Sequence, residues 1–271
     1  MWHSKSMSIL NDEGQTLGYG VVGAPLGTAG IPVLMYHGTT MNRNAWDLVI
    51  GSMPTEHTYI QIDFPGSGES SLPSSPLSVS GLVADALLVL NHLEVEEFHV
   101  AGFSLGAVIA AATAALEPTR VRSATMLCGW KTTDARMRLT FDLWKRLIAN
   151  DPELFARYAF VDGFTANTLT ALEPMIEAIL PTTRDSIAPG SEAHLDLDLI
   201  IDISDLCDRI LAPCLVISGS QDRWVDPSHC EELANAISDS RYVSLPAGHL
   251  VIQELAGDVA QLLSAHISKG E

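Results

Sequence analysis

The chain of 271 residues is 47% apolar and 18% charged, which is the composition of a globular protein large enough to bury a sizeable core in one domain. Its 33 acidic side chains outnumber 15 basic ones, giving a formal net charge of −18, and no lysine or arginine cluster offers a surface for nucleic acid. No apolar run reaches the ~18 residues that a membrane span needs, and the N-terminus has no apolar signal core, so we expect a cytoplasmic protein with neither a nucleic-acid nor a membrane partner.

Strand-like and helix-like patterns alternate along the chain. In chain order they predict a hairpin at 7–11 and 16–23, strands at 31–36 and 58–64, a helix at 79–92, a strand at 98–101, a helix at 107–116, strands at 122–128 and 214–218, a helix at 228–237, a strand at 241–245 and a helix at 250–267. Strands separated by helices indicate a parallel sheet with helices on both faces. Ligands of such sheets bind beside the carboxyl ends of the strands.

Residues 130–208 interrupt this alternation, because they contain helical patterns and no convincing strand. The helical patterns lie at 140–150, 152–160 and 169–178. We interpret the segment as a helical lid over the strand ends rather than as an independent domain. The core is then expected to consist of residues 1–129 and 209–271.

A serine lies at the apex of a predicted strand–turn–helix, in the sequence Gly102-Phe103-Ser104-Leu105-Gly106. Such a sharp turn projects the serine hydroxyl outward, and glycines at its two ends remove Cβ atoms that would collide there. The N–H groups that open the next helix face an oxygen that becomes negative on a substrate. We therefore predict that Ser104 is a nucleophile.

Two later loops contain the residue types that would activate this serine. Asp222 follows a predicted strand, and a carboxylate there can orient an imidazole and stabilise its charged form. Asp226 is the local alternative, but it precedes Pro227, where the role of a helix N-cap suits it better. His249 follows the last predicted strand, and it completes the chain order serine, aspartate, histidine. We predict that His249 is the general base and then the general acid.

An oxyanion hole needs two N–H donors near the serine. Leu105 follows the nucleophile directly and is the first candidate. The second should come from the loop after Gly38, which makes Thr39 the best candidate and Thr40 the next. We expect His37 to have a structural role, in which its ring hydrogen-bonds neighbouring loops and holds the hole in shape.

These motifs, in this order, resemble the α/β-hydrolase fold family, and in particular its lid-bearing, esterase-like branch. The resemblance rests on His37-Gly38, on the run from Asp63 to Ser70, on the turn at Ser104, on Gly219 to Asp222 and on Gly248-His249. It covers nearly the whole chain outside residues 130–208. It implies an eight-stranded, mostly parallel sheet with a lid inserted after the sixth strand, and a covalent acyl-enzyme mechanism without a cofactor.

Departures from neighbouring branches of the family narrow the chemistry. Epoxide hydrolases and haloalkane dehalogenases of this fold have an aspartate where this chain has Ser104, which argues against their reactions. Thr39-Thr40-Met41 replaces the run of glycines of a typical lipase. Hydrolases that cleave carbon–carbon bonds share the serine triad and remain an alternative.

Candidate pocket residues are mostly aromatic and lie in or near the predicted lid. They are Thr40, Trp130, Met137, Phe141, Trp144 and Trp224. Packing of the lid against the core is the alternative for each of them.

The acidic run within 196–208 is interleaved with leucine and isoleucine, so we interpret it as a half-exposed segment and expect no metal site. The scattered cysteines, which include no C-x-x-C pair, fit buried reduced thiols: Cys128, Cys207, Cys214 and Cys230.

Together these residues predict a serine hydrolase that acts on a carboxylic ester, lactone or thioester of a small to medium, largely apolar molecule. Two alternatives use the same residues: cleavage of a carbon–carbon bond next to a ketone, and acyl transfer to an alcohol or amine. A third alternative is a ligand-sensing receptor that retains the fold and turns over little. The sequence does not specify the oligomeric state.

Overall fold

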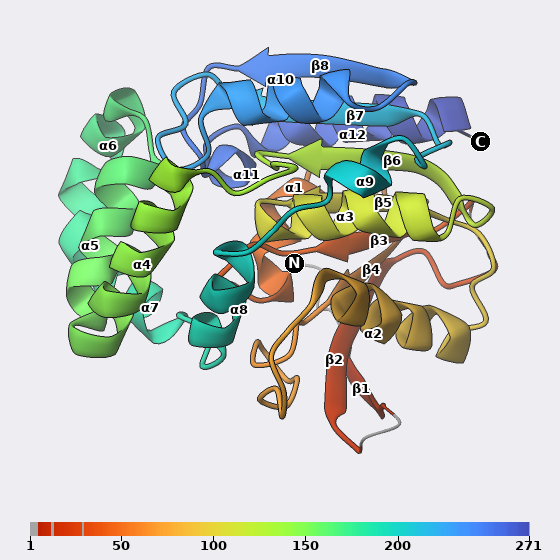
Figure 1. Cartoon of the computed structure of the whole chain (residues 1–271), viewed down its shortest axis with the longest axis horizontal. Coiled ribbons are helices and arrows are strands. Elements are labelled where there is room, and N and C mark those ends of the chain that lie inside the picture. The colour runs from red at the N-terminus through yellow and green to blue at the C-terminus, as the bar shows by residue number, and fades with distance from the viewer. Residues whose placement is uncertain (1–4, 12–13, 29, 271) are drawn as a thin grey trace.

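An eight-stranded sheet forms the centre of the computed structural model, which describes residues 5–11, 14–28 and 30–270 (Figure 1). The strands are β1 (Lys5–Leu10), β2 (Thr16–Gly23), β3 (Val33–Tyr36), β4 (Thr58–Ile62), β5 (Phe98–Phe103), β6 (Val121–Leu127), β7 (Cys214–Gly219) and β8 (Ser240–Leu245). Their order in the sheet is β1-β2-β4-β3-β5-β6-β7-β8. β2 pairs antiparallel with β1 and β4, and the other pairings are parallel, which confirms the predicted sheet.

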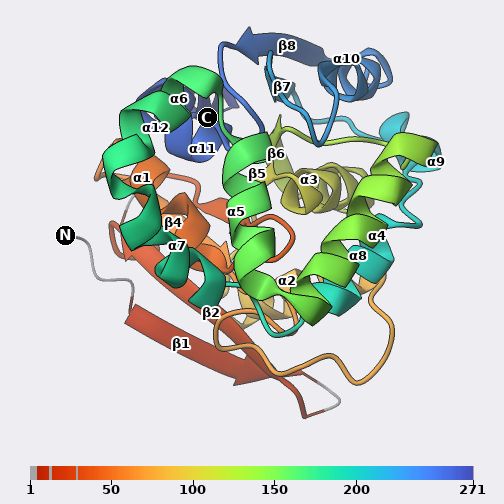
Figure 2. The ribbon, with the colours of Figure 1, turned by 90° about the vertical axis from the view of Figure 1, so that its left-hand side faces the viewer.

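Helices cover both faces of the sheet, as the alternating patterns predict. Those outside the segment between β6 and β7 are α1 (Asp47–Ile50), α2 (Val79–His92), α3 (Leu105–Leu116), α10 (Pro227–Asn235), α11 (Val251–Glu254) and α12 (Ala256–Gly270), with a 3₁₀ turn, η1 (Arg43–Trp46). In Figure 2, α2, α3 and α10 lie on one side of the sheet and α1, α11 and α12 on the other. No helix of the described residues has the length and apolar character needed to cross a membrane.

The segment between β6 and β7 is helical, and its first helices stand beside one end of the sheet, at the left of Figure 1. It contains α4 (Ala135–Asn150), α5 (Pro152–Gly163), α6 (Ala166–Leu172), η2 (Glu173–Met175), α7 (Ile176–Asp185), α8 (Ser191–Asp198) and α9 (Ser204–Cys207). We call α4 to α8 the helical insertion. The prediction of a single helix at 169–178 is wrong, because η2 separates α6 from α7 there.

The acidic run within 196–208 mixes exposed and buried residues, as expected of a half-exposed segment, and its one buried aspartate is Asp198, at the end of α8. One further expectation for a helix is wrong. The helix expected at 250–267 is interrupted at Leu255, whose φ of −131° separates α11 from α12.

Small side chains allow the helix after the central strand to lie close to the sheet. Every residue from Leu105 to Ala115 in α3 is buried, and most of them are alanine. β5, which precedes this helix, is buried along its whole length. The turn between β5 and α3 is therefore held on both sides by buried elements of the core.

The turn at Ser104 depends on glycine. Ser104 has a φ of 56°, in the left-handed region, and a Cβ added to Gly102 would lie 1.9 Å from the backbone oxygen of Gly106. We expect Gly102→Ala to lower the free energy of unfolding by about 3 kcal/mol, measured by urea denaturation. Gly257→Ala is the matched control, because nothing lies within 4 Å of its added Cβ. An equal effect of the two substitutions would contradict this view of the turn.

Candidate active site

The structure brings together three of the predicted site residues from three separate loops. Ser104 lies between β5 and α3, Asp222 in the loop after β7, and His249 in the loop after β8. His249 Nε2 lies 3.0 Å from Ser104 Oγ, and His249 Nδ1 lies 2.7 Å from Asp222 Oδ2. When Nδ1 carries the proton and donates a hydrogen bond to the carboxylate, Nε2 has a free lone pair that can accept the serine proton. The three side chains are therefore arranged for proton transfer away from the hydroxyl.

Backbone groups fix the carboxylate of Asp222. Its Oδ1 accepts hydrogen bonds from the N–H groups of Trp224 and Val225, each at 2.9 Å. The alternative acid, Asp226, instead caps α10 and accepts from the Ser228 N–H at 3.0 Å. These bonds to Ser228 lower the pKa of Asp226. The geometry thus places Asp222 at the imidazole and Asp226 at a helix end.

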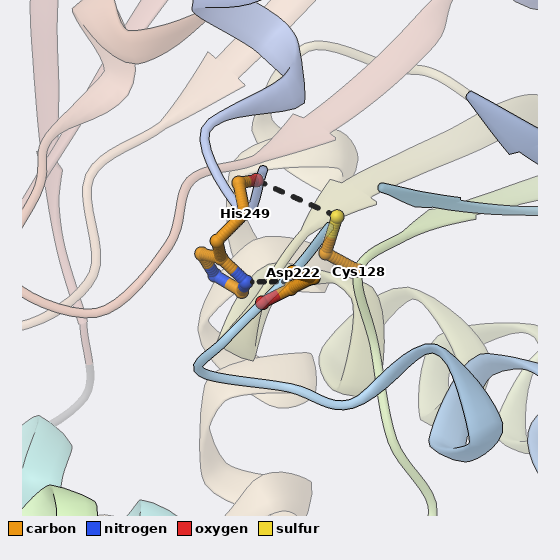
Figure 3. Close-up of side chains that lie close together, drawn as sticks. All are labelled: Cys128, Asp222 and His249. Carbon is orange, nitrogen blue, oxygen red and sulfur yellow. Dashed lines mark hydrogen bonds and ion pairs between the residues drawn. The ribbon is translucent and has the colours of Figure 1, made fainter. Parts of the chain in front are cut away.

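A cysteine that the sequence analysis did not assign to the site lies against this pair. Cys128, directly after β6, has a φ of 51° and donates from Sγ to the backbone oxygen of His249 at 3.5 Å (Figure 3). Burial raises the pKa of its thiol well above the usual value, so the thiol is neutral. All four cysteines are free and buried.

Cys128, Asp222 and His249 are also metal-ligand types, and one ligand atom of each lies within 4.8 Å of the others. Figure 3 shows that these residues already bond to one another: His249 Nδ1 to Asp222 Oδ2, and Cys128 Sγ to the His249 backbone oxygen. A cation at this place would have to replace the bond that orients the imidazole. We therefore interpret the trio as a support for the histidine loop.

The loop after β3 approaches the serine closely. A Cβ added to Gly38 would lie 3.2 Å from Ser104 Cβ, and Thr39 lines the same pocket as Ser104. Leu105 opens α3, where N–H groups have no partner within the helix. The two N–H groups predicted to form an oxyanion hole thus belong to segments on either side of the hydroxyl, and their role stays a prediction.

His37 hydrogen-bonds two neighbouring segments. Its Nδ1 donates to the backbone oxygen of Gly38 at 2.7 Å, and its Nε2 accepts from the N–H of Phe64 at 3.0 Å. Burial lowers the pKa of His37 to about 3, so the ring is neutral. Both ring nitrogens are engaged away from Ser104, in agreement with the structural role expected for this residue.

A pocket of about 650 Å³ lies beside Ser104 and His249. Thr40, Trp144 and Trp224 line it, as expected. Side chains of the helical insertion that sequence reasoning missed form much of the remaining wall: Phe155, Ala159, Phe160, Phe164, Thr168, Leu172, Ile179 and Thr183. Helical periodicity marks these residues as one-sided, but it does not say whether that side faces a cavity or the core.

Trp130, Met137 and Phe141 were expected in the pocket, and the structure places them behind its wall. All three are buried and absent from the residues that line the pocket within the described parts of the chain. The ring of Phe141 lies 5.7 Å from that of Trp130 and 5.8 Å from that of Trp144. They therefore pack the start of the insertion onto the core, which was the alternative for each of them.

Glu254 joins the histidine loop to the helical insertion. Its Oε1 accepts from the N–H of Gly248 at 2.7 Å, and its Oε2 accepts from the hydroxyl of Thr165 at 2.7 Å and from that of Thr168. Gly248 directly precedes His249 in the chain. The carboxylate of Glu254 consequently links the loop of the candidate base to the N-terminus of α6 by hydrogen bonds.

We expect Glu254→Ala to lower kcat/KM by about 10-fold or more, because a small displacement of His249 weakens its alignment with the serine. Ester hydrolysis under steady-state conditions measures the effect. Asp258→Ala is the matched control, since Asp258 is exposed in the first turn of α12 and should leave kcat/KM nearly unchanged. Equal kcat/KM values for both variants would show that the hydrogen bonds of Glu254 are not needed for activity.

The chain is similar to known proteins along most of its length. A family model described as alpha/beta hydrolase fold matches residues 31–254. A pyrrolizixenacetamide deacetylase from Xenorhabdus hominickii is 28% identical over 222 residues, which cover 80% of this chain and 84% of that protein.

Solved structures are also similar. An enol-lactonase from Burkholderia xenovorans LB400 has a TM-score of 0.85 at 20% identity, covering 97% of this chain and 100% of that one. A thermophilic esterase from Thermogutta terrifontis has a TM-score of 0.84 at 23% identity, covering 98% and 99% respectively. At these identities the two structures establish likeness of fold.

Proposed function

This chain belongs to the alpha/beta hydrolase fold family and is a hydrolase of that family, and we propose that it cleaves a carboxylic ester, lactone or thioester through Ser104, His249 and Asp222. The observation that carries this proposal is a chain of two hydrogen bonds, one of 3.0 Å between Ser104 Oγ and His249 and one of 2.7 Å between His249 and Asp222. Ser104 and His249 line a pocket large enough for a small to medium substrate.

In the proposed mechanism Ser104 Oγ attacks the carbonyl carbon while His249 Nε2 takes its proton. The carbonyl oxygen becomes negative and accepts hydrogen bonds from the N–H groups of Leu105 and Thr39. His249 then donates the proton to the leaving oxygen or sulfur, which departs and leaves an acyl-enzyme. A water molecule repeats the sequence, with His249 as its base, and releases the acid.

Two aromatic rings lie close to the imidazole and support its charged state during this reaction. The ring centroids of Trp224 and Phe103 lie 4.9 Å and 5.1 Å from that of His249. Aromatic faces within about 6 Å attract a cation. The imidazolium that exists between the two proton transfers would thus be stabilised by Asp222 at one nitrogen and by the rings around it.

The lining favours an uncharged, apolar substrate. Apart from His249, Glu254 is the one ionisable side chain among the described residues that line the pocket, and hydrogen bonds from Gly248, Thr165 and Thr168 occupy its oxygens. An anionic substrate would meet no counter-charge there and would approach a protein of net charge −18. Similar proteins include a deacetylase, an enol-lactonase and an esterase, whose names agree with chemistry at a carbonyl carbon.

We further propose that the helical insertion, within residues 130–208, is the lid that selects the substrate. Support comes from the pocket wall, to which α4 contributes Trp144, α5 contributes Phe155 and Phe160, and α7 contributes Ile179. The substrate would therefore touch the insertion on one side and the loops of the core on the other.

A fluorophosphonate probe tests the proposed nucleophile, because it phosphonylates an activated serine. We expect stoichiometric labelling of Ser104, located by peptide mass spectrometry, together with loss of hydrolysis of p-nitrophenyl esters. A panel of esters, lactones and thioesters then ranks the substrate classes. Labelling at another serine, or full hydrolysis after labelling of Ser104, would refute the proposal.

A further inference from the structure

Helix α8, the last helix of the insertion, is attached through the backbone to two loops of the core. The N–H of Ala188, just before α8, donates to the backbone oxygen of Thr40 at 2.9 Å. The N–H of Gly190 donates to the backbone oxygen of Gly66 at 2.8 Å. One of these loops contains Thr39, the predicted oxyanion donor. The end of the insertion is thus in direct contact with the oxyanion side of the site.

Two buried side chains of α8 continue these contacts. His194 Nε2 donates to the backbone oxygen of Pro65 at 2.9 Å. One turn later, Asp198 Oδ2 accepts the hydroxyl proton of Thr39 at 2.6 Å. Asp198 has no exposed surface, and its other oxygen, Oδ1, has no hydrogen-bond partner among the described residues. The bond to Thr39 is therefore the main polar interaction of this carboxyl group.

Asp198 acts as a hydrogen-bond acceptor rather than as a charge. Burial raises its pKa to about 8, so the carboxyl group is mostly protonated at neutral pH. A neutral acceptor at this position could equally be an amide oxygen. The helix end is also anchored from behind, because Thr133 Oγ1 donates to the Asp198 backbone oxygen at 2.6 Å.

The position of Thr39 matters because an oxyanion donor must lie about 3 Å from an oxygen that becomes charged during the reaction. Thr39 sits between Gly38, whose loop closely approaches Ser104, and Thr40, whose φ of 66° is in the left-handed region. A short loop with this backbone needs external contacts to keep a single conformation. The bond from its side chain to Asp198 supplies one of them.

We propose that Asp198 is a positioning residue for the oxyanion hole, which holds the Thr39 hydroxyl and thereby aims the Thr39 N–H at the substrate carbonyl oxygen. This inference rests on the proposed hydrolase function. Asp198 touches no substrate and acts through Thr39. Its effect should therefore appear in kcat, where transition-state contacts act, more than in KM.

The test uses four variants and a matched control. Asp198→Ala is expected to lower kcat by about 10- to 100-fold and to change KM by less than about 3-fold. Asp198→Asn, whose amide oxygen can accept from Thr39, should keep kcat within about 3-fold of the unmodified protein. Asp196→Ala is the control, since Asp196 lies on the exposed side of α8, paired with Lys145, and should leave kcat unchanged.

A double-mutant cycle separates positioning from mere support of the fold. Thr39→Val removes the same hydrogen bond from the other end, so adding Asp198→Ala to it should cause no further loss of kcat. Losses that multiply in the double variant would overturn the inference. A fully active Asp198→Ala variant would also overturn it, as would an Asp198→Asn variant as impaired as the alanine.

If Asp198→Ala does not fold, Thr39→Val alone still tests the inference, because it removes the same hydrogen bond from the other end. An unchanged kcat in that variant would overturn the inference. Fluorophosphonate labelling of Ser104 distinguishes this inference from the proposed function. If the unmodified protein is labelled and all Asp198 variants hydrolyse esters equally, only the role of Asp198 is refuted. If Ser104 is not labelled in the unmodified protein, the proposed function itself fails.

Discussion

Replacing Ser104 with alanine should lower kcat for an activated ester by roughly 10⁴- to 10⁶-fold, because the bond-forming atom is then missing. The pocket does not depend on the hydroxyl, so affinity for a non-hydrolysable substrate analogue should change by less than about 3-fold. Steady-state rates measure the first effect, and calorimetric titration measures the second. Loss of turnover with retained binding is the pattern expected of a nucleophile.

Ser220→Ala is the matched control for this substitution. Ser220 is an exposed serine in the loop after β7, near Asp222 in the chain but outside the row of proton transfer. Its removal should leave kcat within about 2-fold. Thermal unfolding of both variants checks that the fold is intact. A Ser104→Ala enzyme with full turnover would assign the chemistry to another residue.

Replacing Asp222 with asparagine should lower kcat by about 10⁴-fold. The side-chain amide can present an N–H to the imidazole where the carboxylate accepted one, which favours the histidine tautomer with its proton on Nε2. That nitrogen then cannot accept the proton of Ser104. Because size and shape are conserved, the free energy of unfolding should change far less than kcat, and chemical denaturation will measure it.

Asp226→Asn is the matched control, because Asp226 lies four residues after Asp222 in the same loop. Asp226 accepts from Ser228 as an N-cap, and asparagine caps helices equally well. We expect kcat to remain within about 2-fold and stability within about 0.5 kcal/mol. The reverse outcome, a large loss at Asp226 and none at Asp222, would mean that the acid is the alternative that we considered from the sequence.

Local patterns were sufficient to predict the sheet and the loops that contain the candidate site. The strand at Phe98–Phe103 and the helix after it are marked by continuous apolar runs, which report burial regardless of the rest of the fold. Ser104, Asp222 and His249 could be found because each follows a strand in a parallel sheet, where strand ends converge. Their proximity is then a consequence of topology.

The insertion was harder to predict, because its contacts are with distant segments. Asp198 belongs to an acidic run that is typical of a solvated surface, yet its partner is Thr39, far away in the chain. Phe141 and Phe155 both lie on helices of the insertion, yet only Phe155 lines the pocket among these two, which depends on how α4, α5 and α7 pack together. Contacts between segments that are far apart in the chain produce no periodic pattern of apolar residues in a single sequence.

One contiguous stretch of chain supplies a large part of the pocket wall, whereas three remote loops supply the reacting groups. Substitutions at Phe155, Phe160 or Ile179 can therefore reshape the cavity without disturbing the bonds at Ser104 and His249. In α5 and α7 the side chains that shape the cavity are thus distinct from those that react. A combinatorial library confined to the inner faces of α5 and α7 would explore new specificities while inheriting intact chemistry.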